Sequence, residues 1–267
     1  MVPDDGSAPD DGERRPPTGR QRQPSAGHQR RLSTGQTVEL PLECEFTLTG
    51  GVFPASARRL SAGLPDRLSP VRIAPRTGAV TLASIEYHYV GGLDPYDEFA
   101  VIVPVVADSR TDLPGAQLVG GLVAGSVGGY VSYLPVTTEA SVALGREIWG
   151  YPKEVADIEI HDRGERRRTI VSIDGERVVS LDMRKAETSE RGATMRSFTR
   201  MDGRLLGSRV ALGGEFALTP LRQRASFSLG DHERADELGK LGLRERPLAT
   251  LYGHRMRARL HPSRELK

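Results

Sequence analysis

Cysteine, tryptophan and lysine are scarce in this chain of 267 residues. Cys44 is its only cysteine, so an intrachain disulfide cannot form and the sequence suits a reducing compartment. A lone cysteine of this kind is read as a small buried apolar side chain, not as a nucleophile. Trp149 is the only tryptophan, and only four of the 37 basic residues are lysines.

The chain also lacks a strong charge of one sign and a long apolar run. Its formal net charge of +2 gives no bulk attraction to a polyanion, and its basic runs lack the interleaved aromatic residues of a nucleic-acid platform. No apolar run approaches the ~20 residues that span a membrane, and the N-terminus lacks the apolar core of a signal peptide. We therefore expect a soluble, cytoplasmic protein that binds neither nucleic acid nor membrane.

Two common kinds of catalytic site are missing from the sequence. Its six histidines are scattered, with no pair at the i,i+4 spacing of helical metal ligands and no cysteine cluster, so we expect no metal. The strained turn that carries a serine nucleophile has no matching motif. This elimination leaves lysine chemistry.

Glycine and proline are abundant, and many short runs between them alternate apolar with polar residues. Thirty glycines and eighteen prolines favour turns and strands over long helices. The alternation predicts strands at 38–40, 44–48, 80–90, 97–107, 155–161, 168–173, 177–184, 208–218, 224–229 and 255–260. The sequence thus predicts an α+β, strand-rich fold, in which a curved or closed antiparallel β-barrel carries a few flanking helices.

Composition divides the chain at residue 38. Residues 1–37 offer almost nothing to bury, so we expect a disordered N-terminal tail. Residues 38–267 are expected to form one folded domain. Within it, Gly50-Gly51 indicates a turn, and residues 54–64 indicate a short helix with Pro54 in its first turn.

A helix, a corner and a strand follow one another near the middle of the chain. Residues 139–149 predict a helix with a threonine N-cap, and Gly150 ends it. Tyr151-Pro152 then forces an extended or turned path, and residues 156–160 alternate as a strand. Lys153 therefore lies on a rigid corner, where neighbouring rings offer an apolar pocket in place of water.

A lysine on such a corner can form an imine once its amine is uncharged. The neutral amine attacks a ketone, and the protonated imine then accepts electrons from the neighbouring carbon. That electron sink serves loss of CO2 from a β-keto acid, and equally serves aldol addition, dehydration and cyclisation. A lysine of ordinary pKa, ~10.4, is neutral in about 1 molecule in 2,500 at pH 7, so burial or a second cation has to favour the free amine.

Gly145-Arg146-Glu147, followed by Tyr151-Pro152-Lys153, resembles the acetoacetate decarboxylase family. Members of that family carry a Gly-Arg-Glu helix end and a Tyr/Phe-Pro-Lys-Lys corner, whose first lysine forms a Schiff base. The resemblance implies that Lys153 does so here, without a cofactor, on a small keto acid. It also implies a cone-like antiparallel barrel with flanking helices, assembled into a homo-oligomer, over residues 38–267.

A second and looser match is Tyr96-Asp97-Glu98, which precedes an apolar strand ending in Pro104-Val105. In the family a Tyr-x-Glu precedes a comparable strand, and its glutamate lies in the active site, which implies Glu98. That carboxylate can donate or accept a proton in catalysis, or it can be a hydrogen-bonded structural group, and the residues alone leave both open.

The chain departs from the family's pattern at two places. The family's second lysine, which lowers the pKa of the first, is Glu154 here, and a carboxylate touching the reactive lysine would suppress attack. Neighbours in an extended segment point to opposite sides, so direct contact is not expected. Residues 48–52 also lack the arginine that binds the substrate carboxylate in the family. Both departures argue against acetoacetate as the substrate more than they argue against imine formation.

Three residues near the corner are candidates for binding substrate. Arg146 can hold a substrate carboxylate or brace the end of the helix, and both readings stay open. Trp149 and Tyr151 are candidates for the wall of the pocket. Together with Lys153 and Glu98 as catalytic residues, they complete the site expected from the sequence.

Three functions remain open at this stage. The leading one is a carboxy-lyase that decarboxylates a small β-keto acid through a Schiff base on Lys153. The second is an aldolase-dehydratase or cyclase on a larger keto acid in secondary metabolism, which Glu154 and the missing arginine favour. The third is a non-catalytic binding protein on the same fold. It predicts that Lys153 is buried in a pair or fully solvated, with no cavity at its tip.

Overall fold

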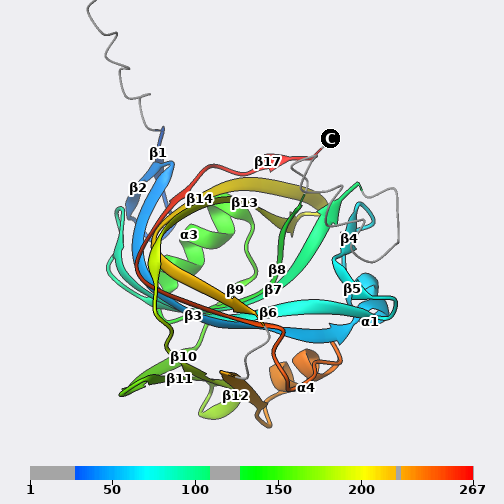
Figure 1. The fold of residues 1–267 in the computed structure, drawn as a ribbon. Helices are drawn as coiled ribbons and strands as arrows, with labels where there is room; N and C mark the ends of the chain where they lie inside the picture. The colour runs from blue at the N-terminus through cyan, green and yellow to red at the C-terminus, as the bar shows by residue number, and fades with distance from the viewer. Residues whose placement is uncertain (1–27, 109–126, 221–223, 267) are drawn as a thin grey trace, which may run out of the picture.

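A closed barrel of seven strands forms the body of the molecule (Figure 1). The computed structural model describes residues 28–108, 127–220 and 224–266. Around the barrel the strands run in the order β7, β6, β3, β16, β14, β13 and β8, and β8 returns to β7. The strand-rich barrel expected from the sequence is confirmed.

Six of the seven contacts between barrel strands are antiparallel, and the seventh, between β8 and β13, is parallel. The antiparallel barrel expected from the sequence did not include this parallel contact. The barrel strands are β3 (Leu42–Ser56), β6 (Thr77–Val90), β7 (Asp97–Ala107), β8 (Val127–Val136), β13 (Ser189–Met201), β14 (Arg204–Pro220) and β16 (Ala249–Leu260).

A second sheet covers one side of the barrel (Figure 1). It consists of β10 (Asp157–Arg163), β11 (Arg166–Ile173), β12 (Glu176–Arg184) and β15 (Ala225–Leu229). The described chain holds three helices: α1 (Ala57–Gly63), α3 (Glu139–Trp149) and α4 (Glu233–Gly239). None of them is long and apolar enough to cross a membrane. The short strands are β1 (His28–Arg31), β2 (Thr37–Leu40), β4 (Leu68–Pro70), β5 (Arg72–Ala74), β9 (Lys153–Val155) and β17 (Arg264–Glu265).

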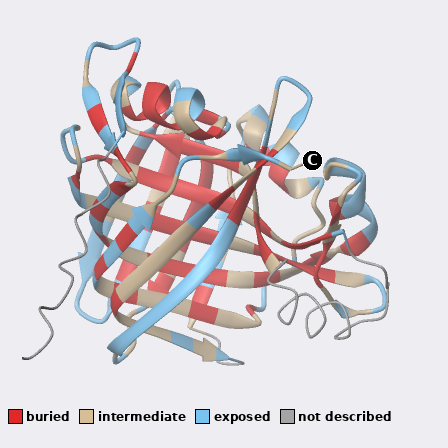
Figure 2. Cartoon of the chain, turned by 90° about the horizontal axis from the view of Figure 1, so that it is seen from above, coloured by how far each residue is buried: buried red, intermediate tan, exposed pale blue. Residues whose placement is uncertain are grey.

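Two apolar cores result from this arrangement, and in Figure 2 the buried residues form bands across the strands. Inside the barrel, Leu144 and Trp149 of α3 pack with residues such as Phe46 and Met256. Between the barrel and the second sheet lies the other core, which includes Phe99. Strand β7 contributes to both cores, as its apolar residues on both faces predicted.

Two local predictions are wrong, and strand pairing is the reason in both cases. Gly50-Gly51 is no turn, because β3 continues through it with partners on both sides. A Cβ on Gly50 would lie 2.9 Å from the carbonyl oxygen of Leu82, so the glycine reflects a close approach of strands. The helix expected over 54–64 begins only at Ala57, since residues 54–56 stay paired with β6.

The last ten residues of the tail that the sequence predicts to be disordered, 28–37, are structured. They form β1 and lead into β2, with Leu32 buried. The Ser33 amide donates to the carboxylate of Glu147 on α3, at 3.2 Å. This contact ties the hairpin to the barrel. The rest of the expected tail, residues 1–27, lies outside the described residues.

Candidate active site

Helix α3 positions the corner that follows it. Thr138 caps the helix, because its hydroxyl oxygen accepts a hydrogen bond from the Ser141 amide at 3.2 Å. Gly150 ends the helix in the left-handed conformation, with a φ of 67°. Trp149, at the last helical position, is buried inside the barrel. The predicted bounds of the helix are confirmed, and the corner after it starts from a fixed point.

Strand β9 sends its side chains alternately to opposite sides. It pairs in parallel with the end of β8, where Lys153 stands opposite Leu134. Lys153 is only 3% exposed and packs against α3. Gly145 makes room for it, because a Cβ at that position would lie 2.7 Å from Cε of the lysine. The glycine of the Gly-Arg-Glu motif is therefore required by the path of the lysine side chain.

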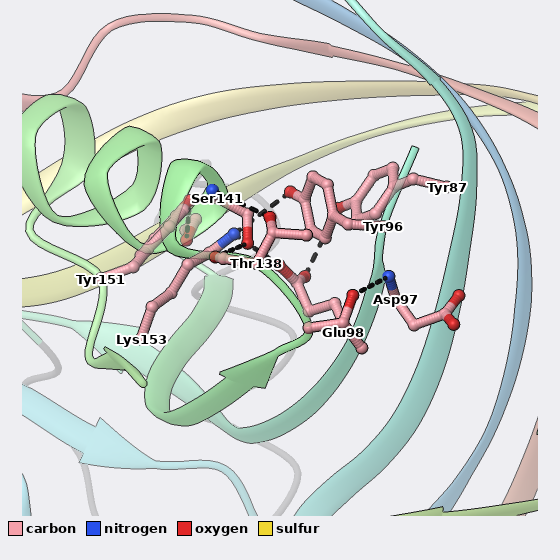
Figure 3. A network of polar contacts seen from close by, with 10 residues as sticks. Tyr87, Tyr96, Asp97, Glu98, Thr138, Ser141, Tyr151 and Lys153 are labelled. Carbon is pink, nitrogen blue, oxygen red and sulfur yellow. Dashed lines mark hydrogen bonds and ion pairs between the residues drawn. The ribbon is translucent and has the colours of Figure 1, made fainter. Parts of the chain in front are cut away.

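The Lys153 ammonium group meets a carboxylate and a tyrosine hydroxyl inside the barrel (Figure 3). Its Nζ lies 2.7 Å from Oε2 of Glu98 and 3.2 Å from the hydroxyl oxygen of Tyr96. The same nitrogen lies 4.9 Å from the centre of the Tyr96 ring. Tyr87 donates a hydrogen bond of 3.4 Å to the other oxygen of the carboxylate. The structure thus brings together the two catalytic residues expected from the sequence.

Burial keeps the groups around this ion pair neutral. Burial raises the pKa of Tyr96 well above its ordinary value, and the Glu98 carboxylate raises it further. The same two causes, in the same order, raise the pKa of Tyr87. They also raise the pKa of the Cys44 thiol to about 12. At neutral pH these three side chains are therefore uncharged, and the two tyrosines act as neutral hydrogen-bonding groups beside the pair.

Glu154 points away from Lys153, as the alternation of an extended strand predicted. Its carboxylate accepts two hydrogen bonds from Arg234 of α4, at 3.0 Å from Nε and 2.8 Å from Nη2. A bidentate pair of this kind is directional and neutralises the carboxylate. The Arg234 guanidinium also lies 5.8 Å from the centre of the Tyr133 ring. The position of the family's second lysine is therefore occupied by a residue that docks α4 onto β9.

A hollow of about 310 Å³ lies beside β9. Arg146, Lys153, Glu154 and Arg234 line it, so two guanidinium groups border it, one of them already paired with a carboxylate. Its apolar wall comes from α4 and the residues after that helix. A volume of this size suits a small molecule. Lys153 belongs to this lining, while its ammonium group is bonded to Glu98.

The three residues expected to bind substrate make their polar contacts with the protein itself. Arg146 donates from Nε to the carbonyl oxygen of Lys153 at 2.8 Å. Trp149 donates from Nε1 to the carbonyl oxygen of His261 at 2.8 Å, and the Tyr151 hydroxyl donates to Oγ of Ser197 at 2.9 Å. The two rings stack, with their centres 5.8 Å apart. These contacts brace the corner, and a role toward substrate stays a prediction.

Two tyrosines beside the ion pair were not among the residues expected from the sequence. Tyr96 begins the Tyr-Asp-Glu segment that pointed to Glu98, and i,i+2 spacing in an extended chain places both on one side. The signal for Tyr96 was therefore present. Tyr87 arrives from β6, and its place depends on the register between β6 and β7. Among the described residues, no group of three or more His, Cys, Asp or Glu could hold a metal ion.

The sequence profile of the acetoacetate decarboxylase (ADC) family matches residues 46–258. The chain belongs to this family. None of the curated proteins matches it. Among solved structures, an acetoacetate decarboxylase from Legionella pneumophila subsp. pneumophila str. Philadelphia 1 is 15% identical, with a TM-score of 0.60 over 85% of this chain and 87% of that one. Another acetoacetate decarboxylase is 17% identical, with a TM-score of 0.60 over 85% and 89%.

The acetoacetate decarboxylase fold also occurs in a relative from a biosynthetic pathway. The enduracididine biosynthesis enzyme MppR, solved with pyruvate, is 14% identical to this chain, with a TM-score of 0.62 over 85% of this chain and 90% of that one. MppR has also been solved with the condensation product of pyruvate and imidazole 4-carboxaldehyde, at 13% identity and a TM-score of 0.55 over 84% and 88%. At these identities the likeness shows the fold, and the chemistry has to be argued from the site.

Proposed function

We propose that this protein is a lyase that forms a Schiff base between Lys153 and a small keto acid. The observation that carries the proposal is the buried ion pair inside the barrel, with Nζ of Lys153 2.7 Å from Oε2 of Glu98. An ionisable pair hidden from water costs free energy, and such pairs concentrate at catalytic sites. Membership of the acetoacetate decarboxylase family supports the same chemistry.

The geometry offers a direct route to the free amine. A proton that moves from Nζ to Oε2 turns the ammonium–carboxylate pair into an amine and a carboxylic acid, with no change in net charge. The amine then attacks the ketone carbon and forms a C–N bond, while Glu98 returns its proton to the carbonyl oxygen. The nitrogen then gives a proton back to the Glu98 carboxylate, which yields the carbinolamine. Glu98 passes this proton to the hydroxyl group, which leaves as water and gives the protonated imine. Glu98 thus serves as both acceptor and donor.

Decarboxylation of a β-keto acid is the leading outcome for this imine. The C–C bond to the carboxylate breaks, CO2 leaves, and the electron pair moves into the imine to give an enamine. Protonation at carbon and hydrolysis of the imine then release the ketone and restore Lys153. The family to which the chain belongs supports this outcome.

Aldol addition followed by dehydration is the second candidate. Two observations favour it: Glu154 stands where relatives carry a second lysine and is held by Arg234, and MppR, with the same fold, has been solved with a condensation product of pyruvate. In this reaction the carbon next to the imine loses a proton to give the enamine. That carbon then forms a C–C bond with an aldehyde, whose oxygen takes up a proton and later leaves as water. A larger keto acid, as expected from the sequence, would suit it.

A non-catalytic binding protein is the third candidate, and one observation favours it. Burial of Lys153 in a pair is what a structural lysine on the same fold would show. The hollow of about 310 Å³ that Lys153 helps to line has neither Glu98 nor Tyr96 in its wall, so it is not the cavity at the tip of the lysine that would argue against this candidate. The homo-oligomer and the cytoplasmic location stay predictions from the resemblance and the composition.

Reductive trapping separates these candidates. The protein is treated with borohydride in the presence of pyruvate or acetoacetate, and its intact mass and peptide map are measured. We expect one adduct on Lys153, no adduct in Lys153→Ala, and an unchanged adduct in the matched control Lys240→Ala. No adduct on the wild type, or the same adduct after Lys153→Ala, would rule out the imine. Release of CO2 from acetoacetate then identifies a decarboxylase, and its absence beside a trapped pyruvate adduct indicates condensation.

A further inference from the structure

A second hollow, of about 480 Å³, lies between the barrel wall and the C-terminal segment. Strands β13 and β14 form one side, and residues 261–266 form the other, with β17 running beside β14 (Figure 1). The C-terminal segment is fixed at both ends of this hollow. The His261 amide donates to the carbonyl oxygen of Arg209 at 2.9 Å, and the Leu266 amide donates to that of Leu205 at 2.9 Å. Backbone hydrogen bonds therefore hold the two walls of the hollow together.

Positive charge is concentrated around this hollow. Arg196, Arg209, Arg264 and His261 line it, and Glu265 is its one acidic residue. The Glu265 carboxylate is turned to Arg204, 3.6 Å away, which does not line the hollow. Within the described chain, none of the three lining arginines has a carboxylate at ion-pair distance. Among residues 28–108, 127–220 and 224–266, no carboxylate therefore serves as a counter-ion for these three guanidinium groups.

The strand register brings these charges together at a cost. Arg196 and Arg209 stand directly opposite each other on adjacent antiparallel strands, where like charges destabilise a sheet. Arg264 is aligned with Gly207, two residues from Arg209. The pKa of His261 is lowered, first by burial and then by the positive charges of Arg209, Arg259 and Arg264. An anion between the arginines would remove this repulsion.

The chemistry of the lining indicates which anion. Guanidinium groups bind phosphate oxygens in pairs of parallel hydrogen bonds, and several of them together suit a group with more than one negative charge. Pro262 and Leu266 add an apolar surface beside the arginines. A volume of about 480 Å³ exceeds what a bare ion needs and suits a small organic molecule.

We propose that this hollow is a binding site for a small phosphate ester or diphosphate. The phosphate lies between Arg196, Arg209 and Arg264, and the organic part lies against the apolar surface. The site is distinct from the Lys153–Glu98 pair and does not depend on imine chemistry. It adjoins the corner through hydrogen bonds from Trp149 to the carbonyl oxygen of His261 and from the Ser263 hydroxyl to the carbonyl oxygen of Ile148.

Calorimetric titration with inorganic pyrophosphate and with phenyl phosphate, at low salt, tests the site. We expect both to bind the wild type, and Arg209→Gln to weaken binding by about tenfold or more. Arg58→Gln is the matched control, because Arg58 is an exposed arginine on α1, away from the hollow, and it should bind like the wild type. Without ligand, Arg209→Gln should unfold at the same temperature as the wild type or higher, since it relieves repulsion.

Four results would overturn this proposal. The first is no heat of binding at millimolar pyrophosphate. The second is equal binding by wild type and Arg209→Gln. The third is citrate binding as tightly as the phosphates, which would make this a carboxylate site. A lower unfolding temperature of ligand-free Arg209→Gln would also contradict it, because the arginine would then have a structural partner. Borohydride trapping on Lys153 is a separate experiment, so failure of the phosphate-site proposal can be told apart from failure of the imine proposal.

Discussion

Lys153 and Glu98 lie 2.7 Å apart, with side chains that are 4% and 6% exposed. At this depth a charge without its partner costs several kcal/mol, so each residue depends on the other. The tyrosines beside them are neutral, because burial and the nearby carboxylate raise the pKa of both. The proton transfer proposed above therefore runs between the lysine and the glutamate, which are in direct contact.

Glu98→Gln removes the proton acceptor and keeps the shape of the side chain. We expect borohydride trapping of pyruvate to slow by about 100-fold, the lower range for loss of a general acid–base group. Glu154→Gln is the matched control: its carboxylate is bound to Arg234, so the trapping rate and its pH profile should not change. Trapping that is as fast in Glu98→Gln as in wild type would mean that Glu98 is only a structural counter-ion.

Cys44 makes stability fall at alkaline pH. Its pKa is raised from 9.0 to about 12 in the folded protein, so the unfolded chain loses this proton first. The stabilisation is complete below pH 9 and is lost as pH rises toward 12. Between pH 8 and pH 10 the free energy of unfolding should fall by roughly 1 kcal/mol more in wild type than in Cys44→Ala. Urea unfolding at both pH values measures this, and equal losses would contradict it.

At the scale of elements, the contact between α3 and β9 sets the position of the reactive amine. Gly145 faces the Lys153 side chain, whose far end is held by Glu98 and Tyr96. Helix α3 can approach β9 this closely only because residue 145 is a glycine and has no side chain. Arg146, next to this glycine, holds the main chain of β9 from the helix end.

Gly145→Ala should displace the lysine without unfolding the barrel. A misplacement of about 1 Å in a reacting group can cost about 100-fold in rate, and we expect a loss of that order in trapping. The matched control is Gly63→Ala in α1, where a Cβ meets nothing within 4 Å. It should leave trapping unchanged and stabilise the protein by up to about 1 kcal/mol. Equal trapping in both variants would show that the close contact is not needed.

Local signals explain which elements could be predicted. The bounds of α3 follow from Thr138 and Gly150, and the opposite directions of Lys153 and Glu154 follow from an extended chain. The partners of these residues could not be predicted in the same way. Arg234 reaches Glu154 from a distant helix, and such contacts depend on the tertiary arrangement. The pairing of Lys153 with Glu98 came only from the family resemblance.

At the scale of the whole molecule, the fold depends on the strand pairing that closes the barrel. The strand-rich fold could be predicted, because alternation and Asp-Gly turns mark strands and hairpins; Asp174-Gly175 and Asp202-Gly203 do join paired strands. The parallel contact between β8 and β13 could not be predicted, since it links strands far apart in sequence. It is short, with Gly128 opposite Arg196 at one end.

Gly128→Ala should weaken this closure. A Cβ on Gly128 would collide with the carbonyl oxygen of Arg196 and lie 2.7 Å from the Phe198 ring. Backbone and a fully buried ring cannot move aside cheaply, so we expect a loss of about 1–3 kcal/mol in the free energy of unfolding. Gly213→Ala on β14, where a Cβ meets nothing within 4 Å, should be close to neutral. Denaturant unfolding of the two variants measures the difference, and equal stabilities would contradict the role of this seam.

The first and last barrel strands are neighbours, with Leu42 of β3 paired to Leu260 of β16. On the ribosome, the wall therefore cannot be completed until residue 260 has emerged, well after Lys153 has been translated. Until then the nascent sheet has two open edges, and the lysine lies in an unfinished interior. The buried environment of Lys153 is thus acquired only after residue 260 has been translated. A chain arrested before β16 carries the lysine but not the closed barrel around it.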